Sequence, residues 1–308
     1  MAFFVSFVCF VGILLSFSCS RADENAASNM AAAREAKKEI RELRAEIKKI
    51  EPFFSPMGKP QAYDWLGTHN EAGQTFEEYL DSDPTKPTKE RQKIYVMPLG
   101  TFTPQQKKAI DITAGYLAAF YDLPVQQMSP RPLVTSVPNI RQNKLLRTRQ
   151  IKTGYILNDV LKPVVPADAA ALIAFTNEDL YPDESMNYVF GQASLEDRVG
   201  VWSLARLDDN ANYDLFLRRT LKVAAHETGH MFSMRHCTKY ECVMSGTNHL
   251  AETDRRPIDA CPECMAKVCW LSDITAADRY KRLAEFCRQN SLHKEAADFD
   301  RKAAAVSS

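Results

Sequence analysis

The feature that most constrains this chain is a dense run of metal-type ligands, HETGHMFSMRHCTKYECVMSGTNHLAETDRRPIDACPEC, between His226 and Cys264. His226 and His230 are separated by one helical turn, so on a helix both imidazoles project from the same face and can bind one metal ion. Glu227 points in another direction, from which its carboxylate can reach the remaining coordination position and take a proton from a bound water. The fold must therefore hold one helix rigidly beside this site.

A third histidine, His236, follows His230 by six residues, which on a continuous helix would place it about 120° away from the first two ligands. The helix is therefore expected to end near Ser233, where the chain needs a left-handed turn. A serine in that conformation costs about 1 kcal/mol more than glycine. This cost is small beside metal-binding free energies of about 10 kcal/mol, so His236 is predicted to complete the ligand set.

A second set of ligands consists of four cysteines, of which the last two form a CxxC: Cys237, Cys242, Cys261 and Cys264. Four thiolates satisfy a tetrahedral zinc and leave no open position, so this site is predicted to be structural. Because Cys237 adjoins His236, a structural zinc would also fix the segment that supplies the third histidine.

This order of ligands resembles the archaemetzincin family, a group of metzincin zinc metallopeptidases, over about residues 60 to 290. The family motif HExxHxxGxxH has glycine where this chain has Ser233. The resemblance implies an α+β fold, a metzincin-like zincin domain with a mixed twisted sheet, an active-site helix carrying HExxH, and C-terminal helices. It also implies that Met244 forms the tight turn beneath the catalytic zinc.

The resemblance further implies an enzyme with two zinc ions, one catalytic and one structural, that cleaves a peptide or protein substrate. A zinc-bound water activated by Glu227 would attack the peptide bond. Some family members have an aminopeptidase-like preference, but no residue in this sequence can be named as the group that captures a free amine. The alternative is a zinc-stabilised peptide-binding module without catalytic activity, against which the intact Glu227 argues.

The amino-acid composition indicates which classes of partner are disfavoured. Of the 308 residues, 45% are hydrophobic and 25% charged, which is ordinary for a globular chain with one large or two small domains. The chain has 39 lysines and arginines and 39 aspartates and glutamates, so it has no net positive charge that would attract nucleic acid. A nucleic-acid-binding zinc module is therefore disfavoured. We expect a monomer.

Four of the eight cysteines cluster around the histidines, which favours metal binding over a disulfide framework. Cys269 and Cys287 are expected to behave as small buried apolar residues. His249 falls at the floor of the site, where it would either bind substrate or serve as a structural loop histidine, and it is left out of the catalytic set. His69 is expected to be a surface histidine.

Residues 3–18 form an apolar run followed by small residues, which predicts a signal peptide over residues 1–22, cleaved after Ser20 or Ala22. The run lacks a positive flank, so two alternatives stay open: a lipid anchor at Cys19 and an uncleaved membrane anchor. In each case the protein is expected to be exported, as a periplasmic, secreted or membrane-anchored chain.

The rest of the chain divides into an N-terminal helical and irregular extension (23–90), the metallopeptidase domain (91–290) and a helical tail (291–308). Within the extension, residues 29–50 predict an amphipathic helix and 51–90 an irregular lead-in, anchored by Trp65, Phe76 and Tyr79. The domain is expected to contain a strand at 93–100, helices at 104–121 and 139–149, and a buried strand at 170–182.

A hairpin is predicted from 186–194 and 198–207, and it is similar to the metzincin edge strand that pairs with extended peptides, although ordinary sheet architecture would give the same pattern. The site helix is expected at 212–232 with Asn212 as its cap, followed by helices at 275–289, with Asp273 as start signal, and 292–305.

Overall fold

The computed structural model describes residues 12–135, 137–145, 147–194, 196–208 and 212–307. The chain divides into two compact units, Met1–Ala45 and Glu46–Ser308. The first unit holds most of α1 (Gly12–Lys48), which includes residues 29–48 of the amphipathic helix predicted over 29–50. Residues 1–11 of the predicted leader lie outside the described residues. Across the part of the chain that the structure describes, no helix combines the length and apolarity needed to cross a membrane.

The second unit is built on a five-stranded sheet with the order β2-β1-β5-β8-β7. Its strands are β1 (Lys93–Leu99), β2 (Val125–Gln127), β5 (Ala169–Thr176), β8 (Val199–Ser203) and β7 (Gly191–Ser194). All neighbours are parallel except β7, which runs antiparallel to β8 at one edge and forms the predicted hairpin with it. Every residue of β5 is buried, as expected of a parallel strand covered on both faces.

A smaller sheet has the order β3-β4-β6, with β3 at Ile140–Asn143, β4 at Thr148–Lys152 and β6 at Asp179–Tyr181. The helix predicted over 139–149 is therefore wrong, since β3 and β4 pair antiparallel from Ile140↔Ile151 to Asn143↔Thr148. Buried Gln150 donates to Asp179 of β6 at 2.8 Å. This cross-strand bonding outweighs the helix propensity of the intervening polar residues. The single strand predicted over 170–182 is likewise two strands, β5 and β6, in different sheets.

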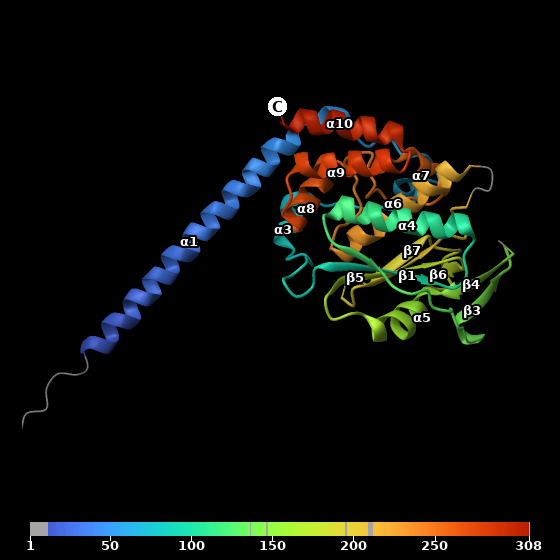
Figure 1. Ribbon diagram of the computed structural model, residues 1–308, viewed down its shortest axis with the longest axis horizontal. Coiled ribbons are helices and arrows are strands. Elements are labelled where there is room, and N and C mark those ends of the chain that lie inside the picture. The colour runs from blue at the N-terminus through green and yellow to red at the C-terminus, as the bar shows by residue number, and fades with distance from the viewer. Residues whose placement is uncertain (1–11, 136, 146, 195, 209–211, 308) are drawn as a thin grey trace, which may run out of the picture. The chain divides into compact units, whose positions relative to one another are not determined.

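Helices cover both faces of the larger sheet (Figure 1). On one face lie α4 (Pro104–Tyr121) and α6 (Tyr213–Met231), and on the other lie α5 (Thr153–Tyr155), a π-helical turn (Ile156–Leu161) and a 3₁₀ turn (Lys162–Val164). Both long helices begin as predicted: α4 has a capping box between Thr103 and Gln106, and Asn212 caps α6 by accepting a hydrogen bond from Leu215 N at 3.1 Å. The site helix is thus fixed against a buried sheet.

The C-terminal part contains α7 (Leu250–Arg255), α8 (Pro262–Ser272), α9 (Ala276–Gln289) and α10 (His293–Ser307). The pairing of α9 with α10 confirms the predicted helices there, whereas α7 and α8 were not predicted. Asp273 does not start α9, because it ends α8 in a left-handed conformation with φ 52°, and Thr275 caps α9 instead. Cys269 and Cys287 are buried free cysteines, as predicted.

The lead-in segment packs on the domain, since the second unit begins at Glu46 rather than at the predicted boundary after residue 90. It contains the 3₁₀ turn η1 (Glu51–Phe53), the α-helical turn α2 (Trp65–Thr68) and the short helix α3 (Phe76–Asp81). Outside this segment, one more 3₁₀ turn, η2 (Val137–Asn139), precedes β3. Phe76 and Tyr79 are fully buried, and the Tyr79 hydroxyl donates to the Phe232 carbonyl at 2.9 Å. The predicted anchoring is confirmed, and it brings the segment to the end of α6.

Candidate functional site

The chain leaves α6 in the turn that the ligand spacing requires. The helix ends at Met231, and Ser233 adopts φ 64°, the left-handed conformation expected there. Met234 N donates back to Gly229 O at 3.0 Å, which closes the helix end. The Ser233 hydroxyl accepts a hydrogen bond from Thr85 N at 3.0 Å, so the side chain that replaces glycine makes a contact glycine lacks.

The three histidines meet at one point. The nitrogens of His226, His230 and His236 all lie within 4.8 Å of one another. His226 Nδ1 is 2.9 Å from Val243 O, and His230 Nδ1 is 2.7 Å from Met234 O. Because a carbonyl only accepts, each Nδ1 carries the proton and each Nε2 keeps its lone pair.

These lone pairs suit a zinc ion. The two Nε2 atoms of His226 and His230 are 3.0 Å apart, close to the roughly 3.3 Å edge of a tetrahedron of nitrogens about 2.0–2.1 Å from zinc. Burial, reinforced by the neighbouring histidines, lowers the pKa of His226 well below its usual range and that of His230 to about 4. Both imidazoles are therefore neutral near pH 7, the state that binds metal.

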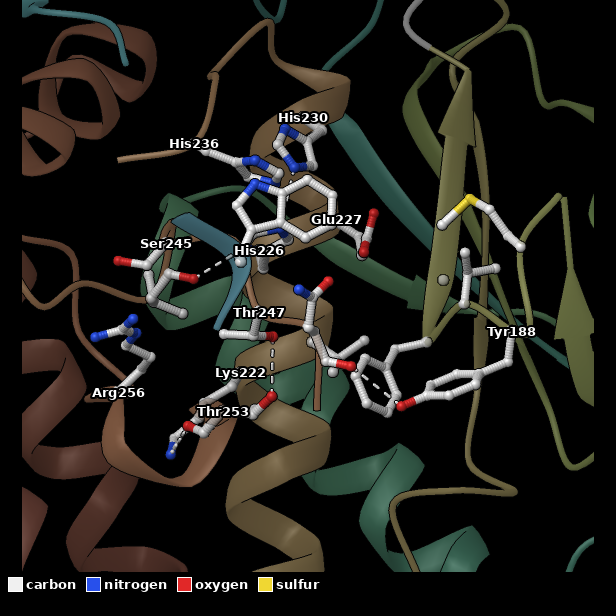
Figure 2. A pocket seen from close by; sticks show the side chains of 18 residues that line it. Tyr188, Lys222, His226, Glu227, His230, His236, Ser245, Thr247, Thr253 and Arg256 are labelled. Atoms are coloured by element: carbon white, nitrogen blue, oxygen red, sulfur yellow. Dashed lines mark hydrogen bonds between the residues drawn. The ribbon is translucent and has the colours of Figure 1, made fainter. Parts of the chain in front are cut away.

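Glu227 lies beside the imidazoles and faces the edge of the sheet (Figure 2). Among the described residues no hydrogen bond or ion pair engages its carboxylate, and burial raises its pKa to about 7. Gly191 of β7 leaves room for it, since a Cβ there would lie 3.2 Å from Glu227 Cγ. A carboxylate without protein partners and with a pKa near neutrality is suited to accept and return a proton.

Met244 packs against the helix that carries His226 and His230. Its side chain is buried, and a Cβ at Gly229 would lie only 2.6 Å from its sulfur, so the glycine of HETGH lets the methionine pack directly against α6. The Met244 carbonyl accepts from Cys237 N at 2.8 Å. Gly229 was missed by the sequence reasoning, because a glycine inside a helix looks locally unfavourable until the packing partner is known.

The four cysteines form one buried cluster, with sulfurs all within 4.8 Å of one another. The Sγ atoms of Cys237 and Cys261 are 3.5 Å apart, which is too far for a disulfide bond of about 2.05 Å. The distance is near the roughly 3.8 Å that separates two sulfurs bound to one tetrahedral zinc ion. Hydrogen bonds from the other three thiols hold the pKa of Cys237 far below its usual range, whereas burial raises that of Cys242. The sulfur set fits a closed zinc site.

The lead-in segment makes contacts with the third histidine that were not predicted from the sequence. Both Glu71 oxygens lie near His236 Nδ1, at 2.9 and 3.1 Å, and the Trp65 ring meets the His236 ring edge-on with centroids 5.0 Å apart. Gln74 Oε1 accepts from Arg235 N at 3.0 Å. His69 is exposed and stacks on Trp65, consistent with the predicted surface role. The segment therefore orients the third histidine.

His249 has a structural role. Its Nδ1 accepts from Glu252 N at 3.2 Å and so caps α7. Asp64, His249 and Glu252 are close enough to hold a metal ion, but the two carboxylates already accept hydrogen bonds from the protein. These bonds come from the groups Arg255 Nη2, Gln61 N, Trp65 N, Asn248 N and Arg256 Nη2. The cluster ties the lead-in segment to α7.

Two cavities flank the centre, one of about 190 Å³ and one of about 720 Å³. His230, Glu227 and His236 line both, as does Gly191 of β7. Within the described residues β7 pairs only with β8, so it is an edge strand, and its residues Gly191, Gln192 and Ala193 line the larger cavity. The site can therefore receive an extended chain beside the three histidines.

Comparison with known proteins finds a matching family and several similar proteins. The model of peptidase family M54 matches residues 154–269, which include all three histidines, Glu227 and the four clustered cysteines. Archaemetzincin-2 from Homo sapiens is 34% identical over 275 residues, covering 78% of this chain and 76% of that protein. The Macaca fascicularis protein of the same name is 33% identical with the same coverage. The crystal structure of archaemetzincin from Methanopyrus kandleri has a TM-score of 0.50 and 27% identity, covering 59% of this chain and 96% of that chain.

Proposed function

Because this chain belongs to the archaemetzincin family of zinc metallopeptidases, we propose that it hydrolyses peptide bonds with Glu227 as general base and with His226, His230 and His236 as the catalytic zinc ligands. One observation carries the proposal: three Nε2 lone pairs converge beside a carboxylate that has no partner among the described residues. A peptide-binding module would have no use for that free carboxylate.

Zinc, when bound, supplies a positive charge that acidifies water and polarises a carbonyl. Glu227 accepts the proton of the attacking water and delivers it to the nitrogen of the leaving chain. Its raised pKa makes both transfers accessible near neutral pH. Val243 O, Met234 O and the Glu71 carboxylate hold the three rings in the orientation and tautomer that this chemistry needs.

The edge strand β7 positions the substrate backbone. A peptide that pairs antiparallel with it, the more stable arrangement, runs opposite to the direction from Gly191 to Ser194. Gly191 borders the smaller cavity, whereas Gln192 and Ala193 line only the larger one. The residues before the cleaved bond would then lie over the larger cavity, and those after it would enter the smaller one.

An aminopeptidase-like preference would require an acceptor for a free amine on the side of the larger cavity. Glu71 lines that cavity, and besides Glu227 it is the only carboxylate among the described lining residues. This placement supports an aminopeptidase-like activity. Digestion of one peptide series with free and with acetylated N-termini tests it, and equal rates for both would exclude the preference.

We assign the four cysteines to a second, structural zinc. The sulfur distances fit such a site. Because Cys237 adjoins His236 in the sequence, the closed site would also fix the segment that carries the third histidine. Elemental analysis should find about two zinc ions per chain, one of them released by a mild chelator and the other only on unfolding.

The central test is Glu227→Gln, which keeps the shape of the side chain and removes the proton acceptor. Hydrolysis should fall by a factor of about 100 or more, since general base catalysis contributes about 10²–10⁴-fold. Zinc content and thermal stability should match the wild type, because Glu227 is not a ligand. Glu90→Gln, at an exposed position, is the matched control.

The same assay, applied to the wild type and to Glu227→Gln, decides between the two functions. If Glu227→Gln hydrolysed peptides at the wild-type rate, this glutamate would not be the general base. A wild-type protein that binds peptides at the three-histidine site without cleaving any would establish the binding-module alternative.

A further inference from the structure

The smaller cavity contains two buried cations opposite the general base. Its described lining includes Lys222 and Arg256, which are only 6% and 8% exposed. Figure 2 draws both side chains away from Glu227, on the side of Ser245 and Thr253. Glu227 is the only carboxylate among the described residues that line this cavity. The charged side chains at the end remote from the catalytic centre are therefore Lys222 and Arg256, of which Arg256 is paired with carboxylates behind the cavity wall.

The Lys222 ammonium has no counter-ion within the part of the chain that the structure describes. It donates to the carbonyls of Thr253 at 2.9 Å and Asp254 at 3.3 Å, and no carboxylate among the described residues lies within ion-pair distance of it. An ammonium has three donors, so one hydrogen remains. Burial lowers the pKa of Lys222 to about 8, as expected for a charge held away from water without a partner. A buried, unpaired cation beside a catalytic centre is a marker of a binding site.

Arg256 adds a second donor. Its two terminal nitrogens pair with Glu241 and Glu252, but its Nε is buried and has no hydrogen-bond partner among the described residues. Buried donors are normally satisfied, so this N–H also calls for an acceptor. A carboxylate offers two oxygens and a negative charge, which match an ammonium hydrogen and a guanidinium hydrogen.

We propose that this cavity binds the acidic side chain of the substrate residue that follows the cleaved bond, with Lys222 and Arg256 as its donors. The position in the substrate follows from antiparallel pairing with β7, so the assignment rests on the proposed function. The lining also contains apolar residues, including Val223 and Phe190, which can hold the methylene groups of a glutamate. The volume of about 190 Å³ is far above that of a single water site.

Lys222 also has a structural contact, because Thr253 and Asp254 belong to the last turn of α7 and their carbonyls accept from it. A purely structural role would make its loss reduce the cleavage of all peptides alike. A carboxylate-binding role predicts a loss confined to acidic substrates. The test must therefore compare substrates and not only rates.

The experiment uses the zinc-loaded full chain and internally quenched peptides with free N-termini that differ only in the residue after the cleaved bond: Glu, Asp, Gln, Ala or Lys. Wild-type kcat/KM should be at least about tenfold higher for Glu than for Gln and Lys. Lys222→Met should bring the Glu-to-Gln ratio close to one while Gln and Ala peptides stay within about threefold of wild type. Lys222→Arg should retain part of the preference, and Lys86→Met, in the lead-in segment, is the control.

Three outcomes would overturn the proposal: equal rates across the wild-type series, an acidic preference that maps before the cleaved bond, or a Lys222→Met variant that loses all substrates equally. The first of these outcomes is measured on the wild-type protein alone, so misfolding of a variant cannot affect it. Cleavage of none of the peptides would refute the proposed function and this inference with it, whereas cleavage without acidic preference refutes this inference alone.

Discussion

Removing Glu71 should weaken the catalytic metal site although Glu71 is not a ligand. The half-buried carboxylate holds His236 Nδ1 at 2.9 and 3.1 Å, which fixes the tautomer and the orientation of that ring. In Glu71→Ala the ring loses this acceptor. Loss of such a partner typically reduces metal affinity about 10–100-fold, equivalent to about 1.4–2.7 kcal/mol of binding free energy.

Glu71→Gln keeps an acceptor oxygen but removes the charge, so its effect should lie near the lower end of that range. The assay is competition for zinc between the protein and a chelator of known affinity, with the metal in the four-cysteine site as an internal reference that should not change. Asp81→Ala, an exposed carboxylate at the end of α3, serves as control. Catalytic-site affinity in Glu71→Ala equal to that of the wild type would refute the reasoning.

Three further predictions follow from the same structure. Cys264→Ser should lower both zinc content and folded yield, and a stable variant that still holds two zinc ions by elemental analysis would contradict the four-cysteine site. Ser233→Ala keeps the left-handed strain but deprives Thr85 N of its acceptor, so denaturant titration should show a loss of about 1 kcal/mol, with Ser233→Gly closer to the wild type because glycine relieves the strain. We also propose that the protein is exported, so N-terminal sequencing of native material should find a start near Arg21 or Asp23, and a chain beginning at Met1 in a soluble cytoplasmic fraction would exclude a cleaved leader.

Local sequence was enough to predict the core of the candidate site. The positions of His226 and His230 on one helix face follow from a repeat of about 3.6 residues per turn, and the end of that helix follows from the place of His236. The start of α6 at Asn212 and the conformation of Ser233 depend on neighbours within a few residues. Such features carry their own signal, because the interacting groups are close together in the chain.

Tertiary structure alone decided what surrounds those ligands. Glu71 lies 165 positions before His236, and nothing in its own stretch distinguishes it from other acidic residues until the lead-in segment packs against the end of α6. The pairing of Lys222 with the carbonyls of α7 and the hairpin of β3 with β4 are likewise set by packing and cross-strand bonds. A local pattern fixes which residues share a helix face, whereas the free energy of long-range burial and hydrogen bonding selects which distant side chains reach it.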